Sequence, residues 1–203
     1  MVVCLMPSNS NDKSTPSRSL RWALLIGFVL IFSIVTQIHM TDGETRREVA
    51  LAAATDLNAE VRVGPAPDFE VIRADGSRIR LSALRGKVVF INFWATWCPP
   101  CREEIPDLEK LAEKMKHVPF EILAVSADES WRDINAFFAG KQTKMLVGLD
   151  PNKQAIARMY GTEKLPETYV VDKNGQLRLR FVNKQPWTDP RIHRYLEWLA
   201  TSQ

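Results

Sequence analysis

The chain has 203 residues, with 45% hydrophobic residues, 25% charged residues and a net charge of +3, which is typical of a globular protein with appendages. The small net charge, and the absence of a dense Lys/Arg block interleaved with aromatic residues, argue against nucleic acid as a partner. The three cysteines, Cys4, Cys98 and Cys101, are too few for a scaffold of several disulfide bridges.

The N-terminal region contains one long uncharged stretch. Residues 22–40 include no Asp, Glu, Lys or Arg and are about long enough to cross the roughly 30 Å core of a bilayer. Three basic residues precede the stretch, which predicts a cytoplasmic tail over residues 1–21 and a single-pass inner-membrane anchor. A cleaved secretory signal and a buried helix of a soluble protein remain as alternatives. The first two readings both place the rest of the chain on the periplasmic side. Cys4 is assigned no role.

A boundary follows this stretch. Residues 41–63 are mixed polar and are expected to form a short helical or disordered stalk. The sequence Gly64-Pro65-Ala66-Pro67 then punctuates the chain, so a folded domain is expected over residues 64–203.

Strand and helix patterns alternate within this domain. Apolar runs and turn residues predict strands at residues 69–72, 78–81, 87–94, 120–127, 145–149, 167–171 and 177–182. Helical periodicity predicts helices at residues 98–116, 131–139, 154–160 and 189–200. This order of elements predicts an α/β fold, in which helices flank a central mixed sheet. Asp172 and Asn174 are interpreted as turn residues of a hairpin.

Cys98 and Cys101 lie between a predicted buried strand and a predicted helix. The thiolate is the species that attacks a disulfide, and a helix N-terminus stabilises an anion. We therefore predict that Cys98 is the nucleophile. Cys101, one turn further along, would resolve the mixed disulfide. Pro99 and Pro100 are compatible with this position, because first-turn N–H groups have no helical partners.

Two other readings of the cysteine pair are weaker. A zinc site would need two further ligands, and His117 and His193 stand alone without ligand spacing. A purely structural disulfide would close so short a loop that it would add little stability. We expect neither a metal site nor a cofactor.

The segment over residues 88–106, VVFINFWATWCPPCREEIP, resembles the TlpA/ResA/CcmG branch of the thioredoxin superfamily. The similarity extends from about residue 64 to the C-terminus and includes APDF at residues 66–69 and LPET at residues 165–168. The resemblance implies a thioredoxin-like fold. The turn sequence ADGS at residues 74–77 joins the strands predicted at residues 69–72 and 78–81 into a hairpin, which would be an N-terminal β-hairpin extension of that fold. It also implies an extracytoplasmic thiol–disulfide oxidoreductase, often held by one N-terminal membrane segment. These motifs are specific for the superfamily and less so for the branch.

The resemblance also assigns roles near the cysteines. In this branch the proline that corresponds to Pro166 is cis and packs against the active-site disulfide, which would place Leu165 and Pro166 beside Cys98. A trans proline at a strand entry is the alternative, because only about 5–6% of X–Pro bonds are cis. Leu165 and Trp97 are candidate substrate-docking residues, although core packing would also explain Trp97. Trp94 is interpreted as a core residue.

Glu104 lies three residues after Cys101, so both share one face of the predicted helix. The resembling branch often has an acid here. A half-buried carboxylate with a raised pKa would exchange protons with Cys101. The alternative is a solvated surface glutamate, as Glu103 is expected to be.

The sequence thus predicts an enzyme that exchanges dithiols and disulfides and acts as a reductant. Its expected partners are a disulfide-containing exported client, a membrane thiol electron donor and, through residues 22–40, the lipid bilayer. The resemblance points to the maturation of cytochrome c as one pathway. Two rival functions remain. A copper-delivery protein of this fold would have two cysteines separated by three residues and a distant histidine ligand. A peroxiredoxin-like thiol peroxidase would need a Pro-x-x-x-Thr/Ser-x-x-Cys motif. Neither pattern occurs in the sequence.

Overall fold

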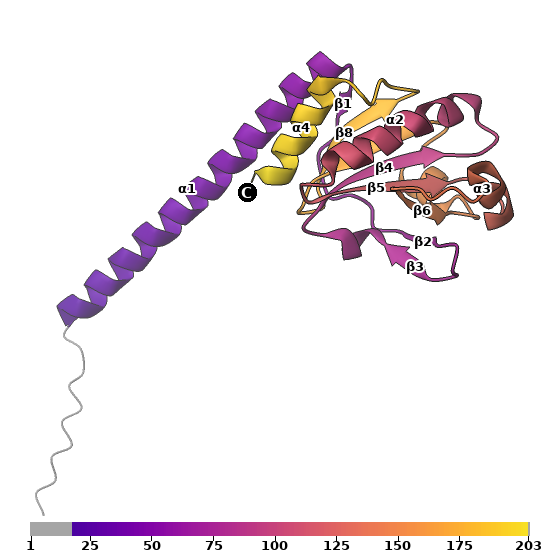
Figure 1. The fold of residues 1–203 in the computed structure, drawn as a ribbon. Coiled ribbons are helices and arrows are strands. Elements are labelled where there is room, and N and C mark those ends of the chain that lie inside the picture. The colour runs from indigo at the N-terminus through magenta and orange to yellow at the C-terminus, as the bar shows by residue number, and fades with distance from the viewer. Residues whose placement is uncertain (1–17, 203) are drawn as a thin grey trace, which may run out of the picture. The chain divides into compact units, whose positions relative to one another are not determined.

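The computed structural model describes residues 18–202, whose elements are shown in Figure 1. The chain divides into two compact units, of which the first ends at Arg47 and the second begins at Glu48. Residues 1–17, which include Cys4 and most of the tail predicted over residues 1–21, lie outside the described part.

Helix α1 (Arg18–Leu57) contributes residues to both units. In the first unit, large apolar side chains of this helix are exposed: Trp22, Ile26, Phe28, Val29, Leu30, Ile31, Phe32, Ile34 and Val35. Among the described residues, no helix combines the length and the apolar character that crossing a membrane requires. The membrane span over residues 22–40 stays a prediction.

The end of α1 belongs to the second unit. Ala54 and Leu57 are buried in its core, and the Arg191 guanidinium donates to the Asp56 carbonyl oxygen over 2.9 Å. The short strand β1 (Glu60–Val61) then pairs with the strand at residues 177–182. Part of the segment predicted as a stalk is therefore packed onto the domain through apolar contacts and strand pairing.

One mixed eight-stranded sheet forms the centre of the second unit, in the order β1-β8-β7-β4-β5-β6-β2-β3. The strands after β1 are β2 (Glu70–Ile72), β3 (Arg78–Arg80), β4 (Val88–Trp94), β5 (Phe120–Ser126), β6 (Leu146–Leu149), β7 (Glu167–Val171) and β8 (Leu177–Val182). Strands β4, β5 and β6 run parallel, and the other pairings are antiparallel. The structure confirms the predicted α/β fold with a mixed sheet.

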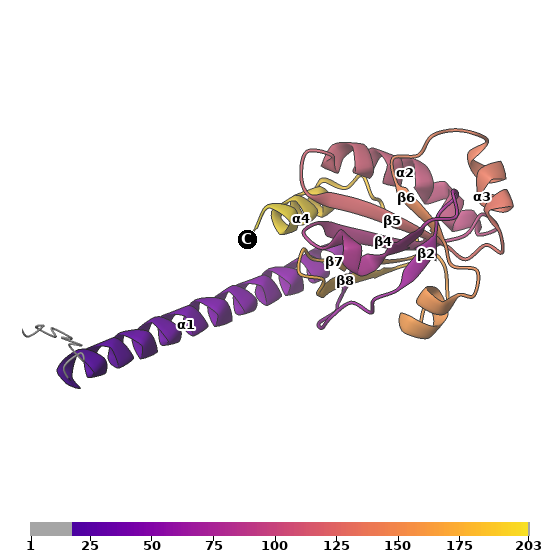
Figure 2. The ribbon, with the colours of Figure 1, turned by 90° about the horizontal axis from the view of Figure 1, so that it is seen from below.

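Helices cover both faces of this sheet. Their bounds are α2 (Pro99–Met115), α3 (Trp131–Phe138), α4 (Pro190–Thr201), the 3₁₀ helix η1 (Leu81–Leu84) and the π-helical turn η2 (Gln154–Met159). Helices α2 and α4 lie on one face and contact each other, whereas η2 lies on the opposite face (Figure 2). An α-helix was expected at residues 154–160. The wider turn forms because the Asp150 carboxylate accepts the N–H groups of Gln154 and Ile156, each over 3.0 Å.

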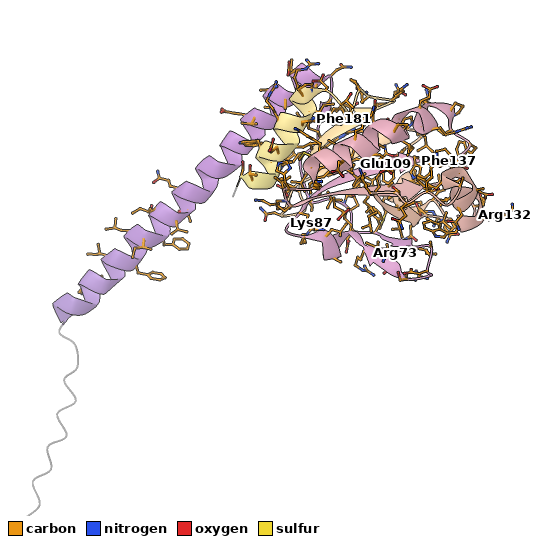
Figure 3. All side chains as sticks on the ribbon, in the orientation of Figure 1. Arg73, Lys87, Glu109, Arg132, Phe137 and Phe181 are labelled. Atoms are coloured by element: carbon orange, nitrogen blue, oxygen red, sulfur yellow. A yellow bond between two sulfur atoms is a disulfide. The ribbon has the colours of Figure 1, made fainter. Side chains whose placement is uncertain are left out.

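Strand β4 places the key side chains, because all seven of its residues are buried and alternate between the two faces. Phe90 faces α4 and packs edge-on against Trp187 at 4.9 Å, and Trp187 packs in the same way against Phe181, labelled in Figure 3. Phe93 faces the other way and contacts Tyr160 and Tyr169. Asn92 lies on the same face as Phe90 and therefore points toward α2.

Candidate active site

The two predicted redox cysteines lie where β4 ends and α2 begins. Cys98 is the N-cap of α2, and Cys101 lies in its first turn. A disulfide joins the two residues, whose Cα atoms are 5.3 Å apart. The described state is therefore the oxidised form of a vicinal dithiol, at the strand–helix junction that the sequence predicted.

The two sulfur-bearing residues differ in their access to solvent. Cys98 is 5% exposed and Cys101 is 0% exposed, while the neighbouring Trp97 is 62% exposed. Pro99 and Pro100 are also exposed. A client disulfide can therefore approach from the Cys98 side, which supports the predicted order of attack.

The start of α2 is poor in hydrogen-bond donors. Pro99 and Pro100 occupy the first two helical positions and have no N–H group, and no side chain caps the helix at Cys98. The N–H of Cys101 is the first that the helix offers to an anion at its N-terminus. The helix dipole still favours a thiolate at Cys98, but with fewer direct donors than an ordinary helix start provides.

The Leu165–Pro166 peptide bond is cis, as the resemblance predicted. Glu167 pairs with Phe93, which places Pro166 level with the C-terminal end of β4. Cys98 follows this same end of β4. Pro166 is buried and Leu165 is partly buried. The Asn183 N–H donates to the Pro166 carbonyl oxygen over 3.0 Å and ties this segment to the end of β8.

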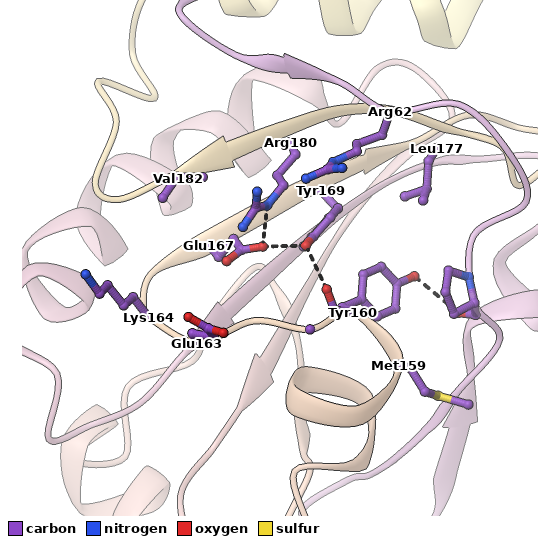
Figure 4. Close-up of a pocket in the computed structure, with 12 residues that line it drawn as sticks. Arg62, Met159, Tyr160, Glu163, Lys164, Glu167, Tyr169, Leu177, Arg180 and Val182 are labelled. Carbon is purple, nitrogen blue, oxygen red and sulfur yellow. Dashed lines mark hydrogen bonds and ion pairs between the residues drawn. The ribbon is translucent and has the colours of Figure 1, made fainter.

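Polar contacts fix the strand that follows this proline (Figure 4). The buried Glu167 carboxylate accepts from the Arg180 Nε over 2.6 Å and from the Tyr169 hydroxyl. The same hydroxyl lies 3.2 Å from the Tyr160 carbonyl oxygen. These contacts join β7, β8 and the end of η2 on the face opposite α2, so the segment carrying Pro166 is held from both sides.

Glu104 is buried on the inner face of α2, so the alternative of a solvated surface glutamate is wrong. Its Oε1 accepts from the Asn92 Nδ2 over 2.8 Å, and its Oε2 accepts from the Trp187 Nε1 over 2.9 Å. Burial raises the pKa of Glu104 to about 7, although both hydrogen bonds oppose the rise. A carboxyl group with this pKa is suited to exchanging protons near neutral pH.

Two residues of this carboxyl site were not identified from the sequence. Asn92 also donates to the Thr168 hydroxyl oxygen over 3.0 Å, and it therefore links α2, β4 and β7. A single polar residue within the apolar run of β4 was a signal for its role. No sequence signal marks Trp187, which lies 83 residues from Glu104 and reaches it only through the fold.

The remaining predicted residues have clear positions. Trp94 is fully buried and packs against Phe137 and Phe138, which confirms its interpretation as a core residue. Asp172 accepts the N–H groups of Asn174 and Gln176, each over 2.9 Å, in the turn between β7 and β8. Within residues 18–202, no group of three or more His, Cys, Asp and Glu side chains is arranged to hold a metal ion.

Comparisons with known proteins agree with this geometry. Residues 64–180 match the AhpC/TSA family. The thiol-disulfide oxidoreductase ResA of Bacillus thuringiensis (strain Al Hakam) is 36% identical over 132 residues, which cover 65% of this chain and 75% of the relative. ResA of Bacillus subtilis (strain 168) is 34% identical over 138 residues, which cover 68% of this chain and 75% of the relative.

A solved structure gives the same result. The protein from Chlorobium tepidum described as the thiol:disulfide interchange protein DsbE is 31% identical with a TM-score of 0.61, and the match covers 68% of this chain and 96% of that one. The shared fold, the cysteine pair at a helix start and the similarity to named relatives lead to one assignment. The chain belongs to the AhpC/TSA family of thioredoxin-like proteins, in the branch of ResA-like thiol–disulfide oxidoreductases.

Proposed function

We propose that this chain reduces disulfide bonds of exported proteins. The observation that carries the proposal is the buried Glu104, which shares a helix face with Cys101 and has a pKa of about 7. When ionised, this carboxylate adds negative charge near the pair and raises the pKa of its thiols. The missing N–H groups of Pro99 and Pro100 act in the same direction. Both effects reduce the extra stability of the dithiol form that a strong oxidant requires.

The reaction begins when the Cys98 thiolate attacks one sulfur of the client disulfide. The client S–S bond breaks, one client sulfur leaves as a thiolate, and a Cys98–client mixed disulfide forms. Cys101 then transfers its proton to the Glu104 carboxylate, and its sulfur attacks Cys98. The second client thiolate leaves, and the Cys98–Cys101 disulfide forms, as in the described structure. The client gains two electrons and the enzyme loses two.

Client docking is assigned to the surface around Cys98. Trp97 is exposed beside the nucleophile and offers a large apolar face with a polar N–H. Leu165 and the buried cis Pro166 precede β7 and lie level with the C-terminal end of β4, which Cys98 follows. We assign Trp97 and Leu165 to contacts with the client chain on either side of its reacting cysteine.

The proposed location is extracytoplasmic, with residues 22–40 as the export or anchoring segment. The run of exposed apolar side chains from Ile26 to Val35 supports this proposal, because such a run is stabilised when lipid or another apolar surface covers it. An oxidising compartment requires a source of electrons, so a membrane thiol donor must regenerate the dithiol. A C-terminal reporter that is active only in the cytoplasm would contradict this location.

The similarity to ResA and DsbE proteins supports a client in cytochrome c maturation, where haem-binding thiols must be reduced. The decisive experiment equilibrates the purified domain with glutathione and dithiothreitol buffers. We expect a potential well below about −200 mV, whereas a value near the roughly −120 mV of a strong oxidant would contradict a reductant. Peroxide consumption and copper titration, run on the same sample, test the peroxidase and copper-delivery alternatives.

A further inference from the structure

Asp128 is a buried acid outside the cysteine and Glu104 site. It lies just beyond the end of β5 and is 2% exposed. Its carboxylate accepts from the Thr96 backbone N–H over 3.1 Å, from the Thr96 hydroxyl over 2.8 Å and from the Ser126 hydroxyl over 2.5 Å. Three neutral donors therefore surround one buried carboxylate.

The contact matters because Thr96 lies two residues before Cys98, in the loop that joins β4 to α2. The Cys98 N–H donates to the Ala95 carbonyl oxygen over 3.2 Å, and the Ala127 N–H donates to the Trp94 carbonyl oxygen over 2.9 Å. The loop is thus a tight turn between the fixed end of β4 and the start of α2. Asp128 holds the middle of this turn by both the backbone and the side chain of Thr96.

The Cys98 side chain makes no capping hydrogen bond at the helix start, and its one bond to α2 is the disulfide with Cys101. The position of its sulfur, once the disulfide opens, therefore depends on the turn before it. Within the described residues, Asp128 has no Lys, Arg or His at ion-pair distance, although several other acids of this domain do. An unpaired buried carboxylate is costly for stability, and here its hydrogen bonds go to the loop of the nucleophile.

We propose that Asp128 is a positioning residue for Cys98, which acts through Thr96 to keep the sulfur oriented for attack on the client disulfide. The proposal rests on the proposed function. A displacement of about 1 Å at a reacting atom can cost about a hundredfold in rate, so loss of the turn geometry should be visible in exchange kinetics.

Asp150 provides the matched control. It lies at the end of β6, is 4% exposed, and accepts two backbone N–H groups from η2. Asp128→Ala and Asp150→Ala each remove a buried carboxylate that organises a turn. Of these two acids, only Asp128 accepts hydrogen bonds from Thr96.

The test compares the variants in three measurements: the single-turnover rate with an oxidised peptide, the pH profile of Cys98 alkylation by iodoacetamide, and the thermal midpoint. We expect Asp128→Ala to lower the exchange rate by about tenfold or more and to shift the alkylation profile. Asp150→Ala should lower the midpoint comparably but leave both cysteine readouts near wild type. Asp128→Asn, which keeps an oxygen acceptor for Thr96, should recover part of the rate.

A second pair of variants applies if Asp128→Ala does not fold. Thr96→Ala removes the hydroxyl donor, and Thr96→Ser retains it. We expect the alanine variant to be slower and the serine variant to restore the rate and the alkylation profile.

Equal, wild-type-like behaviour of Thr96→Ala and Thr96→Ser would overturn the proposal. So would an Asp128→Ala protein that is destabilised but unchanged in both cysteine readouts. Alkylation needs no client, so it tests the role of Asp128 even when the wild-type protein does not reduce the peptide. A wild-type protein that does not reduce the peptide would contradict the proposed function alone.

Discussion

The Asn92 side chain donates to the Glu104 carboxylate over 2.8 Å, and this contact joins the central strand β4 to the helix that carries both cysteines. Trp187 donates to the other carboxylate oxygen from the segment before α4. Glu104 is therefore held in the interior by two neutral donors, and burial is the largest influence on its pKa. The acid–base behaviour of the site depends on this arrangement.

Substitution of the cysteines should separate attack from resolution. Cys98→Ser should abolish disulfide reduction, because Cys101 is fully buried and cannot reach a client. Cys101→Ser should instead accumulate Cys98–client mixed disulfides, because the resolving thiol is absent. Non-reducing gels with and without dithiothreitol measure both outcomes. Trapping that required Cys101 and not Cys98 would reverse the two roles.

Glu104→Gln should slow resolution and remove the step near pH 7 from the pH–rate profile. The ionised carboxylate accepts the Cys101 proton, and its loss should cost about 10²-fold in the resolution step. Removal of the negative charge should also lower the pKa of the cysteine thiols. The exposed Glu103, paired with Lys184 over 2.7 Å, supplies the control Glu103→Gln. An unchanged profile in Glu104→Gln would remove Glu104 from the mechanism.

Glu104 should also make stability depend on pH. Its pKa rises from 4.5 when unfolded to about 7 when folded, so the folded state binds the proton more tightly. The resulting stabilisation is fully present below pH 4.5 and is lost as the pH rises through 7, by about 3 kcal/mol in total. Urea unfolding of the oxidised domain at pH 4.5 and pH 8 measures this change. The free energy of unfolding of Glu104→Gln should lack this part of the pH dependence. Parallel plots of unfolding free energy against pH for the variant and the wild type would contradict the prediction.

Trp187→Phe should raise the pKa of Glu104 further, because the variant keeps most of the ring but loses the N–H that stabilises the carboxylate. A hydrogen bond to a charged group contributes about 1.5–3 kcal/mol, which corresponds to an increase of about 1–2 pKa units. The step in the pH–rate profile should move upward by this amount. Trp198→Phe, in α4 and packed against Tyr195, is the control and should leave the step in place.

Trp97→Ala should weaken client binding more than chemistry. Loss of an exposed aromatic anchor beside Cys98 should raise KM for a protein client by about tenfold, while the rate with glutathione disulfide falls much less. Met159→Ala removes another exposed apolar side chain, on η2 at the opposite face, and is the control. Equal losses with both substrates would assign Trp97 to packing around the cysteines and not to docking.

The sequence alone predicted the elements and the reactive pair, because both depend on short-range patterns. The apolar run before Cys98, the two-residue spacing to Cys101 and the turn residues around Asp172 act within a few residues of one another. The cis bond before Pro166 was implied by a local motif in the same way. The helical period also placed Glu104 on the face of Cys101.

Only the tertiary structure decided whether Glu104 was buried, and with it the direction and size of its pKa shift. Its partners Asn92 and Trp187 come from 12 residues before it and 83 residues after it. The same holds for Asp128, whose link to Thr96 spans 32 residues. Desolvation and hydrogen bonding depend on every element packed around a group. The residues next to that group in the chain do not indicate which distant residues folding will bring into contact with it.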